Sequence, residues 1–299
     1  MPHPAPRRDP FSPELLAGGR VLVTGGGSGL GREIARVLVA HGAAVHLWGR
    51  RLSALEQAAA DIGGDAVSVQ SVDVRDGDAV DAAMEEIFAG SGPLTGVVNG
   101  AAANFVAPTA QLSPRAFRAV TSTVMDGSFH VATAAGRRWL DAGLPGAIVS
   151  LLTTWVWSGS AFVVPSAMAK AAVHAMTMSL AVEWAAAGIR VNAVAPGPVP
   201  TEFAWDVLDP GRDEVIAATD PRGVPAGRHG TPEEVARLVM FLLSDACDYL
   251  TGETIAMDGG QRLAGPGTFA ALRALEPEDW QRIRERAQVA TAASKAQRG

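Results

Sequence analysis

Val21-Leu22-Val23-Thr24-Gly25-Gly26-Gly27-Ser28-Gly29-Leu30-Gly31 joins a short apolar run to a helical pattern, and it largely determines which fold is expected. The spacing Gly25-x-x-x-Gly29-x-Gly31 permits a tight turn and lets backbone N–H groups and a helix N-terminus approach a pyrophosphate. After the first strand of a βαβ unit, such a loop predicts a dinucleotide site. The contacts expected from it are Gly25, Gly27, Ser28, Gly29, Leu30 and Gly31.

Apolar runs alternate with helical patterns along most of the chain. The expected strands are 21–23, 44–48, 66–69, 95–99, 147–152, 190–195 and 254–257, and the expected helices are 30–40, 52–62, 79–88, 114–140, 166–184 and 232–243. Strands separated by helices of this length pair in parallel through right-handed crossovers. The pattern therefore predicts the α/β class, with a single Rossmann-type doubly wound parallel sheet of about seven strands and helices on both faces.

The domain organisation is expected to be simple, because the sequence has no internal repeat and no break in composition. We expect a proline- and arginine-rich N-terminal arm over 1–17, a Rossmann-fold dinucleotide-binding and catalytic domain over 18–262, and a C-terminal helical tail over 263–299. The irregular stretch 197–230 is long for a compact domain, which favours a substrate-covering loop, with a structural insertion as the alternative.

Composition excludes several classes of protein. Of the 299 residues, 48% are hydrophobic and 19% charged, which excludes a disordered chain and a highly charged coiled coil. A net charge of -6 without a basic block disfavours nucleic acid as a partner. No apolar run approaches the roughly 18 residues of a membrane span, and no signal peptide precedes the domain, so we expect a cytoplasmic protein without a membrane partner.

Cysteine and histidine usage predicts no metal site. Cys247 is the single cysteine, so neither an internal disulfide nor a cysteine-rich zinc site can form within one chain. The histidines His130, His174 and His229 are scattered singly and lack the spacing of metal ligands.

The end of the second expected strand favours one form of the dinucleotide. A carboxylate there would hold the ribose hydroxyl of NAD, but the sequence is Trp48-Gly49-Arg50-Arg51. A guanidinium forks onto a phosphate, so Arg50 and Arg51 favour NADP(H), with an arginine stacked on the adenine as the alternative. Asp73, followed by Val74, is a candidate to accept the adenine amino proton, although it suits the start of a helix equally well.

Lys170 is unusual for its residue type. Of 25 basic residues only two are lysines, and the other, Lys295, is in the tail. Lys170 lies on an otherwise apolar helix, where a compact ammonium can hydrogen-bond ribose hydroxyls and shift its pKa to serve in a proton relay. We therefore expect it to be both catalytic and cofactor-binding, with a snorkelling surface lysine as the alternative.

Together with Asn99-Gly100-Ala101-Ala102, Pro196-Gly197-Pro198-Val199-Pro200-Thr201 and Asp258-Gly259-Gly260, these segments resemble the short-chain dehydrogenase/reductase family over about 18–262. Within that family the chain most resembles the mitochondrial-type 2,4-dienoyl-CoA reductases, through 100–105, 112–114, 159–167, 196–198, 267–269 and Trp280. The resemblance implies NADPH, a homotetramer, and a fatty acyl-CoA reduced by hydride transfer to a conjugated C=C system.

The motifs of this resemblance also extend the expected sites. Further cofactor contacts are expected at Asn99, Ala101, Pro196, Gly197, Val199 and Thr201. Substrate contacts are expected at Asn104, Phe105, Trp155, Trp157, Phe162 and Arg228, the last as a partner for the CoA phosphates.

The chain departs from the family pattern at the catalytic tyrosine. Ordinary members place it four residues before the lysine, where Ser166 stands here, and the dienoyl-CoA reductases supply theirs from upstream, where Trp155 stands here. An indole N–H does not release its proton near neutral pH, so Trp155 cannot be a general acid. The one tyrosine, Tyr249, is far away, which excludes a tyrosine-dependent mechanism unless another subunit supplies it.

Three other residues are candidates for the missing chemistry. Asp126 corresponds to an active-site asparagine of the mitochondrial-type reductases, and a carboxyl buried beside Lys170 could sustain a proton relay, with a helix-surface carboxylate as the alternative. Thr153 stands at the usual place of the catalytic serine and could polarise a carbonyl, or simply end a strand. Ser166 could contact substrate or cap its helix.

These departures rank the possible reactions. Hydride transfer to a conjugated thioester spreads charge into a dienolate, so it depends less on simultaneous protonation than ketone reduction does. We therefore rank conjugated-alkene reduction first. A repurposed short-chain reductase for a ketone, imine or other metabolite stays open, favoured by Trp155 and Trp157, as does a non-catalytic dinucleotide-binding protein, disfavoured by Lys170.

Overall fold

A computed structural model describes residues 9–104, 106–201, 223–265, 278–279 and 281–282 of the chain. Seven parallel strands form one sheet in the order β3-β2-β1-β4-β5-β6-β7. The strands are β1 Arg20–Thr24, β2 Ala44–Gly49, β3 Val67–Ser71, β4 Gly96–Asn99, β5 Gly146–Leu151, β6 Ile189–Pro196 and β7 Thr254–Met257. This order reverses between β1 and β4, as in a doubly wound sheet, and the predicted fold class is confirmed.

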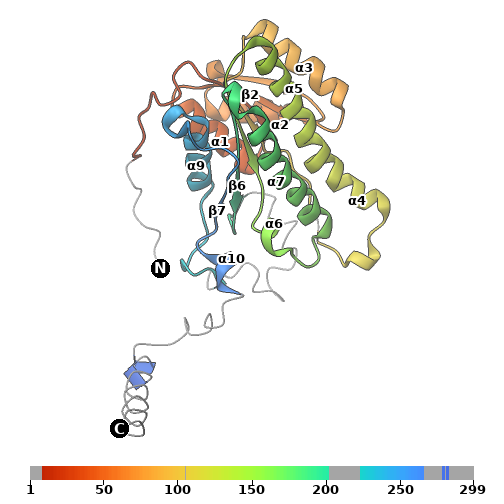
Figure 1. The fold of residues 1–299 in the computed structure, drawn as a ribbon, viewed down its shortest axis with the longest axis vertical. Helices are drawn as coiled ribbons and strands as arrows, with labels where there is room; N and C mark the ends of the chain where they lie inside the picture. The colour runs from red at the N-terminus through yellow and green to blue at the C-terminus, as the bar shows by residue number, and fades with distance from the viewer. Residues whose placement is uncertain (1–8, 105, 202–222, 266–277, 280, 283–299) are drawn as a thin grey trace.

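Helices cover both faces of the sheet (Figure 1). They are α1 Gly29–Ala40, α2 Leu52–Ile62, α3 Gly77–Gly90, α4 Pro114–Thr121, α5 Gly127–Ala142, α6 Trp155–Ser158, α7 Val164–Trp184, α9 Pro232–Leu243 and α10 Gln261–Ala264. Helices α1, α2 and α9 pack on one face and α3, α5 and α7 on the other.

The core explains why the strands read as continuous apolar runs. Successive residues of a strand point to opposite faces, so in β1 Val21 and Val23 enter one core while Leu22 enters the other. Because helices cover both faces, β4 and β5 are buried throughout their length.

The expected helix 114–140 is interrupted. The structure has α4, a π-helical turn over Ser122–Asp126, and then α5. Around the turn the hydroxyls of Thr121, Ser122 and Thr123 each donate to the backbone carbonyl four residues earlier. Such side-chain bonds compete with the amide bonds of a regular helix, which gives a physical reason for the irregular turn.

Two short helices were not predicted from the sequence. α6 follows β5 and α10 follows β7, so both lie beyond the carboxyl ends of the strands, at the lower end of Figure 1. This is the edge at which open parallel sheets bind ligands. Residues 1–8, most of the irregular stretch 197–230 and most of the expected tail lie outside the described residues.

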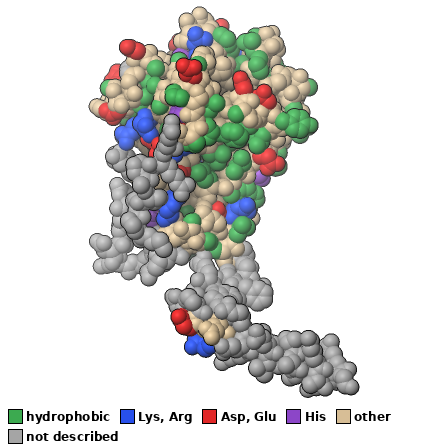
Figure 2. Space-filling model, turned by 90° about the vertical axis from the view of Figure 1, so that its left-hand side faces the viewer, with side chains coloured by type: hydrophobic (Ala, Val, Ile, Leu, Met, Phe, Trp, Pro, Cys, Tyr) green, Lys and Arg blue, Asp and Glu red, His purple; other side chains and the backbone are tan. Residues whose placement is uncertain are grey.

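In the described part of the chain no helix is long and apolar enough to cross a membrane. In the face drawn in Figure 2, Lys and Arg side chains are scattered among acidic ones and form no continuous basic patch.

Candidate active site

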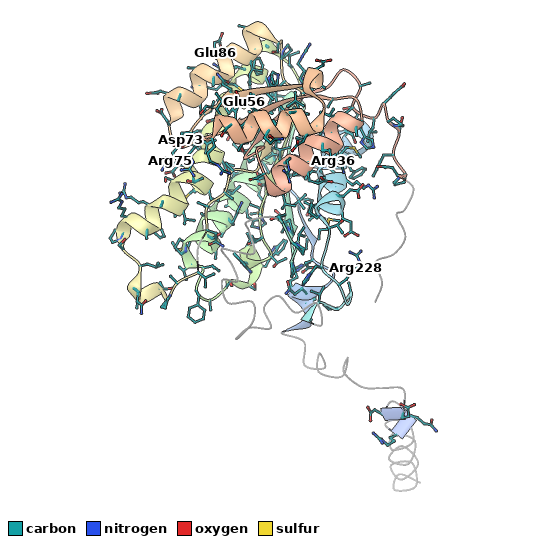
Figure 3. All side chains as sticks on the ribbon, turned by 180° about the vertical axis from the view of Figure 1, so that it is seen from behind. Arg36, Glu56, Asp73, Arg75, Glu86 and Arg228 are labelled. Atoms are coloured by element: carbon teal, nitrogen blue, oxygen red, sulfur yellow. The ribbon has the colours of Figure 1, made fainter. Side chains whose placement is uncertain are left out.

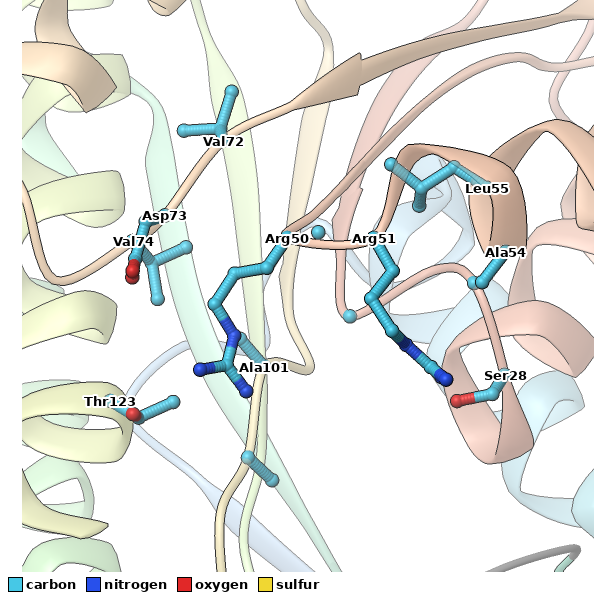
Figure 4. Close-up of a pocket in the computed structure, with 14 residues that line it drawn as sticks. Ser28, Arg50, Arg51, Ala54, Leu55, Val72, Asp73, Val74, Ala101 and Thr123 are labelled. Atoms are coloured by element: carbon cyan, nitrogen blue, oxygen red, sulfur yellow. The ribbon is translucent and has the colours of Figure 1, made fainter. Parts of the chain in front are cut away.

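A groove of about 450 Å³ follows the carboxyl ends of β1 to β4 (Figure 4). Its lining contains eight of the residues expected at the dinucleotide: Gly25, Gly27, Ser28, Arg50, Arg51, Asp73, Val74 and Ala101. They come from the loops after four different strands, which meet at one edge because the strands are parallel. The groove also includes Thr123 of the π-helical turn, which sequence reasoning did not identify.

Glycines are required where this loop folds on itself. Gly25 has φ +72°, and a Cβ there would lie 2.9 Å from the Gly100 carbonyl oxygen. A Cβ on Gly31 would collide with the Gly25 carbonyl. A side chain at either position would therefore push α1 or the β4 loop out of place. Leu30 is half-buried and packs against the core, so only its backbone is suited to face a ligand.

The N-terminus of α1 is open to the groove. Ser28 occupies the N-cap position with extended backbone, makes no side-chain cap hydrogen bond, and no acidic residue follows in the first turn. The first amides of a helix otherwise need a partner, and an anionic group satisfies both them and the helix dipole. The groove therefore fits a pyrophosphate at α1.

Arg50 and Arg51, which follow β2, differ from Asp73 across the groove in whether they have an ion-pair partner. Arg50 and Arg51 extend into the groove, Arg51 toward Ser28 (Figure 4), and neither forms an ion pair within the described residues. Asp73 is bound by Arg75, whose guanidinium donates to its carboxylate and lowers the Asp73 pKa. Figure 3 shows these two side chains together.

Lys170 is buried in α7, 7% exposed, and its Nζ donates to the Leu151 carbonyl at the end of β5. Burial lowers the pKa of this ammonium to about 8, and among the described residues no carboxylate opposes the desolvation. The pKa therefore lies within about one unit of neutral pH, which suits a group that gives up and regains a proton.

The expectation that Asp126 is buried beside Lys170 is wrong. Asp126 is half-buried and forms no ion pair with Lys170; it lines a separate hollow of about 330 Å³ with Phe129 and Met176. Val124 is completely buried at the inward position. Val124 and Asp126 both lie in the π-helical turn, where two residues advance by a little less than half a turn, so Asp126 points away from the buried side taken by Val124.

Two polar residues on the neighbouring strands have unpaired atoms. Thr153, two residues after β5, has a buried hydroxyl oxygen without a hydrogen-bond partner in the described residues. The Asn99 amide nitrogen donates to the Ser128 carbonyl and the Ser150 hydroxyl, so this side chain points into the core, and its buried carbonyl oxygen has no partner either. An orphaned hydroxyl at this edge is suited to bind a ligand oxygen.

Ser166 is buried in the first turn of α7 but does not cap it, because the N-cap residue is Val163. The capping interpretation of Ser166 is therefore wrong. Phe162, four residues before Ser166, is exposed and has φ +65°, a backbone conformation that a bulky side chain rarely adopts.

The other expected substrate residues are spread around the edge. Trp155 and Asn104 are half-buried, and Trp157 is 42% exposed. Phe105 lies outside the described residues. Arg228 is held by Glu234 in a two-point ion pair, with N to O distances of 2.9 and 2.6 Å, so the structure places it at the start of α9 (Figure 3).

The segment after β6 reaches the cofactor side. Gly197 packs on Asp258, because a Cβ there would lie 2.7 Å from the Asp258 Cα, and Pro196 ends β6. Thr201 lies over the glycine loop, with its Cβ 3.6 Å from where a Gly29 Cβ would stand. Val199 lines a smaller cavity of about 160 Å³.

Sequence reasoning also missed Arg262. Its guanidinium lies 4.6 Å from the centre of the Trp157 ring, although the two residues are far apart in the chain. The only available signal was its position two residues after Gly260, at the end of Asp258-Gly259-Gly260-Gln261-Arg262.

The chain is similar to proteins of one family. A family model described as enoyl-(acyl carrier protein) reductase matches residues 25–262. A Bacillus subtilis protein named probable 2,4-dienoyl-CoA reductase, (2E)-enoyl-CoA-producing, is 40% identical over 81% of this chain and 96% of its own. A Caenorhabditis elegans protein named probable 2,4-dienoyl-CoA reductase 3, (3E)-enoyl-CoA-producing, is 38% identical over 89% of this chain and 88% of its own.

A solved structure shares the fold at similar identity. It is described as a putative NAD(P)-dependent gluconate 5-dehydrogenase from Beutenbergia cavernae with bound NADP at low occupancy. It is 34% identical, has a TM-score of 0.77, and the match covers 84% of this chain and 99% of that one. With the seven-stranded sheet, the glycine loop and the buried Lys170, these findings show that the chain belongs to the short-chain dehydrogenase/reductase family, a family of oxidoreductases.

Proposed function

We propose that this protein is an NADPH-dependent reductase that transfers a hydride to a conjugated acyl thioester such as 2,4-dienoyl-CoA, without a catalytic tyrosine. One observation carries the proposal: the site keeps a buried Lys170, yet Trp155 and Ser166 stand at the two tyrosine positions that the resemblance implies. Tyr249 is fully exposed, on the segment after the 3-10 turn Asp245–Cys247. The names of the two dienoyl-CoA reductase relatives support this substrate class.

The residues of the groove fit NADP(H). The pyrophosphate would lie at the open N-terminus of α1, and Arg50 or Arg51 would hold the 2′-phosphate, since neither forms an ion pair in the described chain. When bound, the dinucleotide supplies the hydride. Lys170 would hydrogen-bond the ribose hydroxyls and hold its ammonium at the reacting edge.

Thr153 and Ser166 are the proposed substrate-facing hydroxyls. The Thr153 hydroxyl would donate to the thioester carbonyl oxygen, where negative charge develops as hydride adds to the δ-carbon and a dienolate forms. The Thr153 hydroxyl oxygen has no hydrogen-bond partner in the described chain, so Thr153 can bind the substrate without breaking an existing hydrogen bond.

The proton has to come from a group other than tyrosine. We propose that it arrives from solvent through the Lys170 ammonium, because burial brings the pKa of Lys170 to about 8. Protonation at the α-carbon would leave a (3E)-enoyl product and protonation at the γ-carbon a (2E)-enoyl product. The names of the two relatives differ at this point, so the product has to be measured.

We further propose that the enzyme is a cytoplasmic homotetramer. Several exposed apolar side chains lie on α5 and α7 and on the turn between α4 and α5: Met125, Phe129, Leu140, Met178 and Val182. A surface of this kind is usually covered in an oligomer.

A second candidate function is reduction of a ketone or another small carbonyl compound. Trp155 and Trp157 add two bulky side chains on α6, just beyond the end of β5, and the Beutenbergia relative is described as a putative gluconate 5-dehydrogenase.

The decisive experiment offers a 2,4-dienoyl-CoA, a plain enoyl-CoA and a β-ketoacyl-CoA to the purified protein with NADPH, and follows NADPH absorbance and product double-bond position. We expect turnover of the dienoyl-CoA alone, and a large loss of kcat in Thr153→Val. Thr133→Val is the matched control, because its hydroxyl bonds the Phe129 carbonyl on the outer face of α5. Turnover of the β-ketoacyl-CoA alone would establish the second candidate. A large loss of kcat in Asp126→Asn would instead identify Asp126 as the proton donor.

A further inference from the structure

Four side chains from four separate elements form a chain of contacts beside the site. His174 of α7 hydrogen-bonds the Thr254 hydroxyl of β7, at 2.8 Å from Nδ1 to Oγ1. The Trp157 ring of α6 meets the His174 ring edge to face, with centroids 6.0 Å apart. The Arg262 guanidinium of α10 covers the Trp157 ring, its Cζ 4.6 Å from the ring centroid.

Helix α6 packs on α7, but within the described residues few side-chain hydrogen bonds hold it. It is four residues long, its N-cap residue Thr154 makes no side-chain cap bond, and the Ser158 hydroxyl bonds only the adjacent Gly159 carbonyl. Val156 packs on the small core beneath α7. In the described part of the chain, the outward side of α6 is therefore held by Trp157, between His174 and Arg262.

The Arg262 guanidinium is well placed to hold Trp157. Within the described residues it forms no ion pair, and its backbone is fixed because the Arg262 amide donates to Asp258 Oδ2 at 2.8 Å. Asp258 also accepts the Gly260 amide, so the turn between β7 and α10 sets where Arg262 starts. A planar guanidinium stacks on an aromatic face better than an ammonium does.

We propose that Arg262 is a positioning residue for the acyl substrate. By stacking on Trp157 it holds α6 against α7, and so it fixes Trp155 and Trp157, which together we call the aromatic wall. This inference rests on the proposed function, since it assigns the wall to the acyl group. It gives the segment after β7 a role in substrate binding that is separate from the cofactor groove.

Hydrogen exchange of the peptide 152–163 tests the contact without any substrate. A cation–π contact at an exposed site corresponds to about a two- to five-fold change in an equilibrium. We expect exchange in α6 to rise by about that factor in Arg262→Met and to be partly restored in Arg262→Lys. Leu263→Ala, on the same turn and 65% exposed, is the matched control and should leave α6 unchanged.

A double-mutant cycle shows whether Arg262 acts through Trp157. In a Trp157→Leu background, the further change Arg262→Met should have no effect on exchange. In the active enzyme, Arg262→Met should raise KM for the dienoyl-CoA about two- to five-fold and leave kcat and the KM for NADPH unchanged. Unchanged exchange in Arg262→Met, or fully additive effects in the cycle, would overturn the inference.

The outcome is separable from the proposed function. If the wild-type protein does not reduce the dienoyl-CoA, the proposed function fails, while the exchange measurements still decide whether Arg262 holds α6. If the enzyme is active and only the exchange data are negative, the positioning role alone fails.

Discussion

Helices α1 and α9 pack against each other on one face of the sheet, yet only the N-terminus of α9 is capped by side chains. At α9, the Thr231 hydroxyl accepts the Glu234 amide at 3.2 Å, and the Glu234 carboxylate accepts the Thr231 amide at 2.9 Å. At α1, the Ser28 side chain makes no cap hydrogen bond and no acid follows in the first turn. The α9 end is closed by its own side chains, and the α1 end is left open.

The same contrast separates two cations. Arg228, beside α9, is partly exposed and paired with Glu234. Lys170 is buried and has only the Leu151 carbonyl as a partner in the described chain. The start of α9 and the cation beside it are therefore satisfied by side chains of the protein, whereas the start of α1 and Lys170 have no side-chain partner among the described residues.

Lys170→Met should have the largest effect on activity, because it removes the buried cation of the candidate active site. We expect kcat to fall by about 10²- to 10⁴-fold if Lys170 relays the proton, with NADPH still bound. Steady-state kinetics and NADPH titration by fluorescence measure the two effects separately. Retention of most of the wild-type kcat would remove Lys170 from the reaction.

The pKa of Lys170 also predicts a pH dependence of stability. In the unfolded chain the lysine has its ordinary pKa of 10.5 and in the folded protein about 8, so between these values the unfolded chain binds more protons. The free energy of unfolding therefore gains a contribution that rises with pH over that window. Denaturant titrations at several pH values should show this rise in the wild type and its loss in Lys170→Met.

Ser28→Asp would convert the open helix start into a closed one. A capping carboxylate should stabilise the protein without cofactor by about 0.5 kcal/mol, because it suits the N-terminal amides and the dipole. The same charge would repel a pyrophosphate, so Kd for NADPH should rise at least about ten-fold. Calorimetry and thermal melts measure both, and tighter NADPH binding would show that α1 is not the phosphate site.

The sequence was sufficient for the parts of the site that depend on backbone and local spacing. Gly25 and Gly31 are required by contacts within the loop itself, and the parallel strands then bring Arg50 and Asp73 to the same edge. Both follow from residue type and chain order, which the sequence displays. The family was recognised from the same local motifs and is confirmed by the matching relatives.

The parts that were missed depend on rotation and on distant contacts. Asp126 was expected beside Lys170, but a π turn interrupts the helix where three hydroxyls bond back onto it, and Val124 takes the inward position. No local pattern reports which way a residue faces after such a turn. The stack of Arg262 on Trp157 joins two short helices that have no periodic signal of their own.

Substitutions at Arg50 and Arg51 test whether the groove at α1 binds the 2′-phosphate of NADPH. Substitution of the arginine that holds the 2′-phosphate by Met should weaken NADPH binding by about ten-fold or more, because a charge-assisted hydrogen bond is lost, and should leave NADH binding unchanged. Each variant is titrated with both dinucleotides, and Arg36→Met, on the far part of α1 and paired with Glu33, is the control. Equal losses for the two dinucleotides would favour stacking on the adenine instead.

Changes at α9 should have the smallest effect and should leave cofactor binding alone. Thr231→Ala removes the cap and should lower the free energy of unfolding by about 1 kcal/mol. Arg228 is the main cause that lowers the pKa of Glu234 to about 2, so this carboxylate stabilises the fold above its ordinary pKa of 4.5 and loses that effect as pH falls toward 2. The difference in melting temperature between wild type and Glu234→Gln should therefore be present near neutral pH and shrink on acidification. A change in NADPH affinity in either variant would mean that the closed helix start also contributes to the site, and the contrast with α1 would not hold.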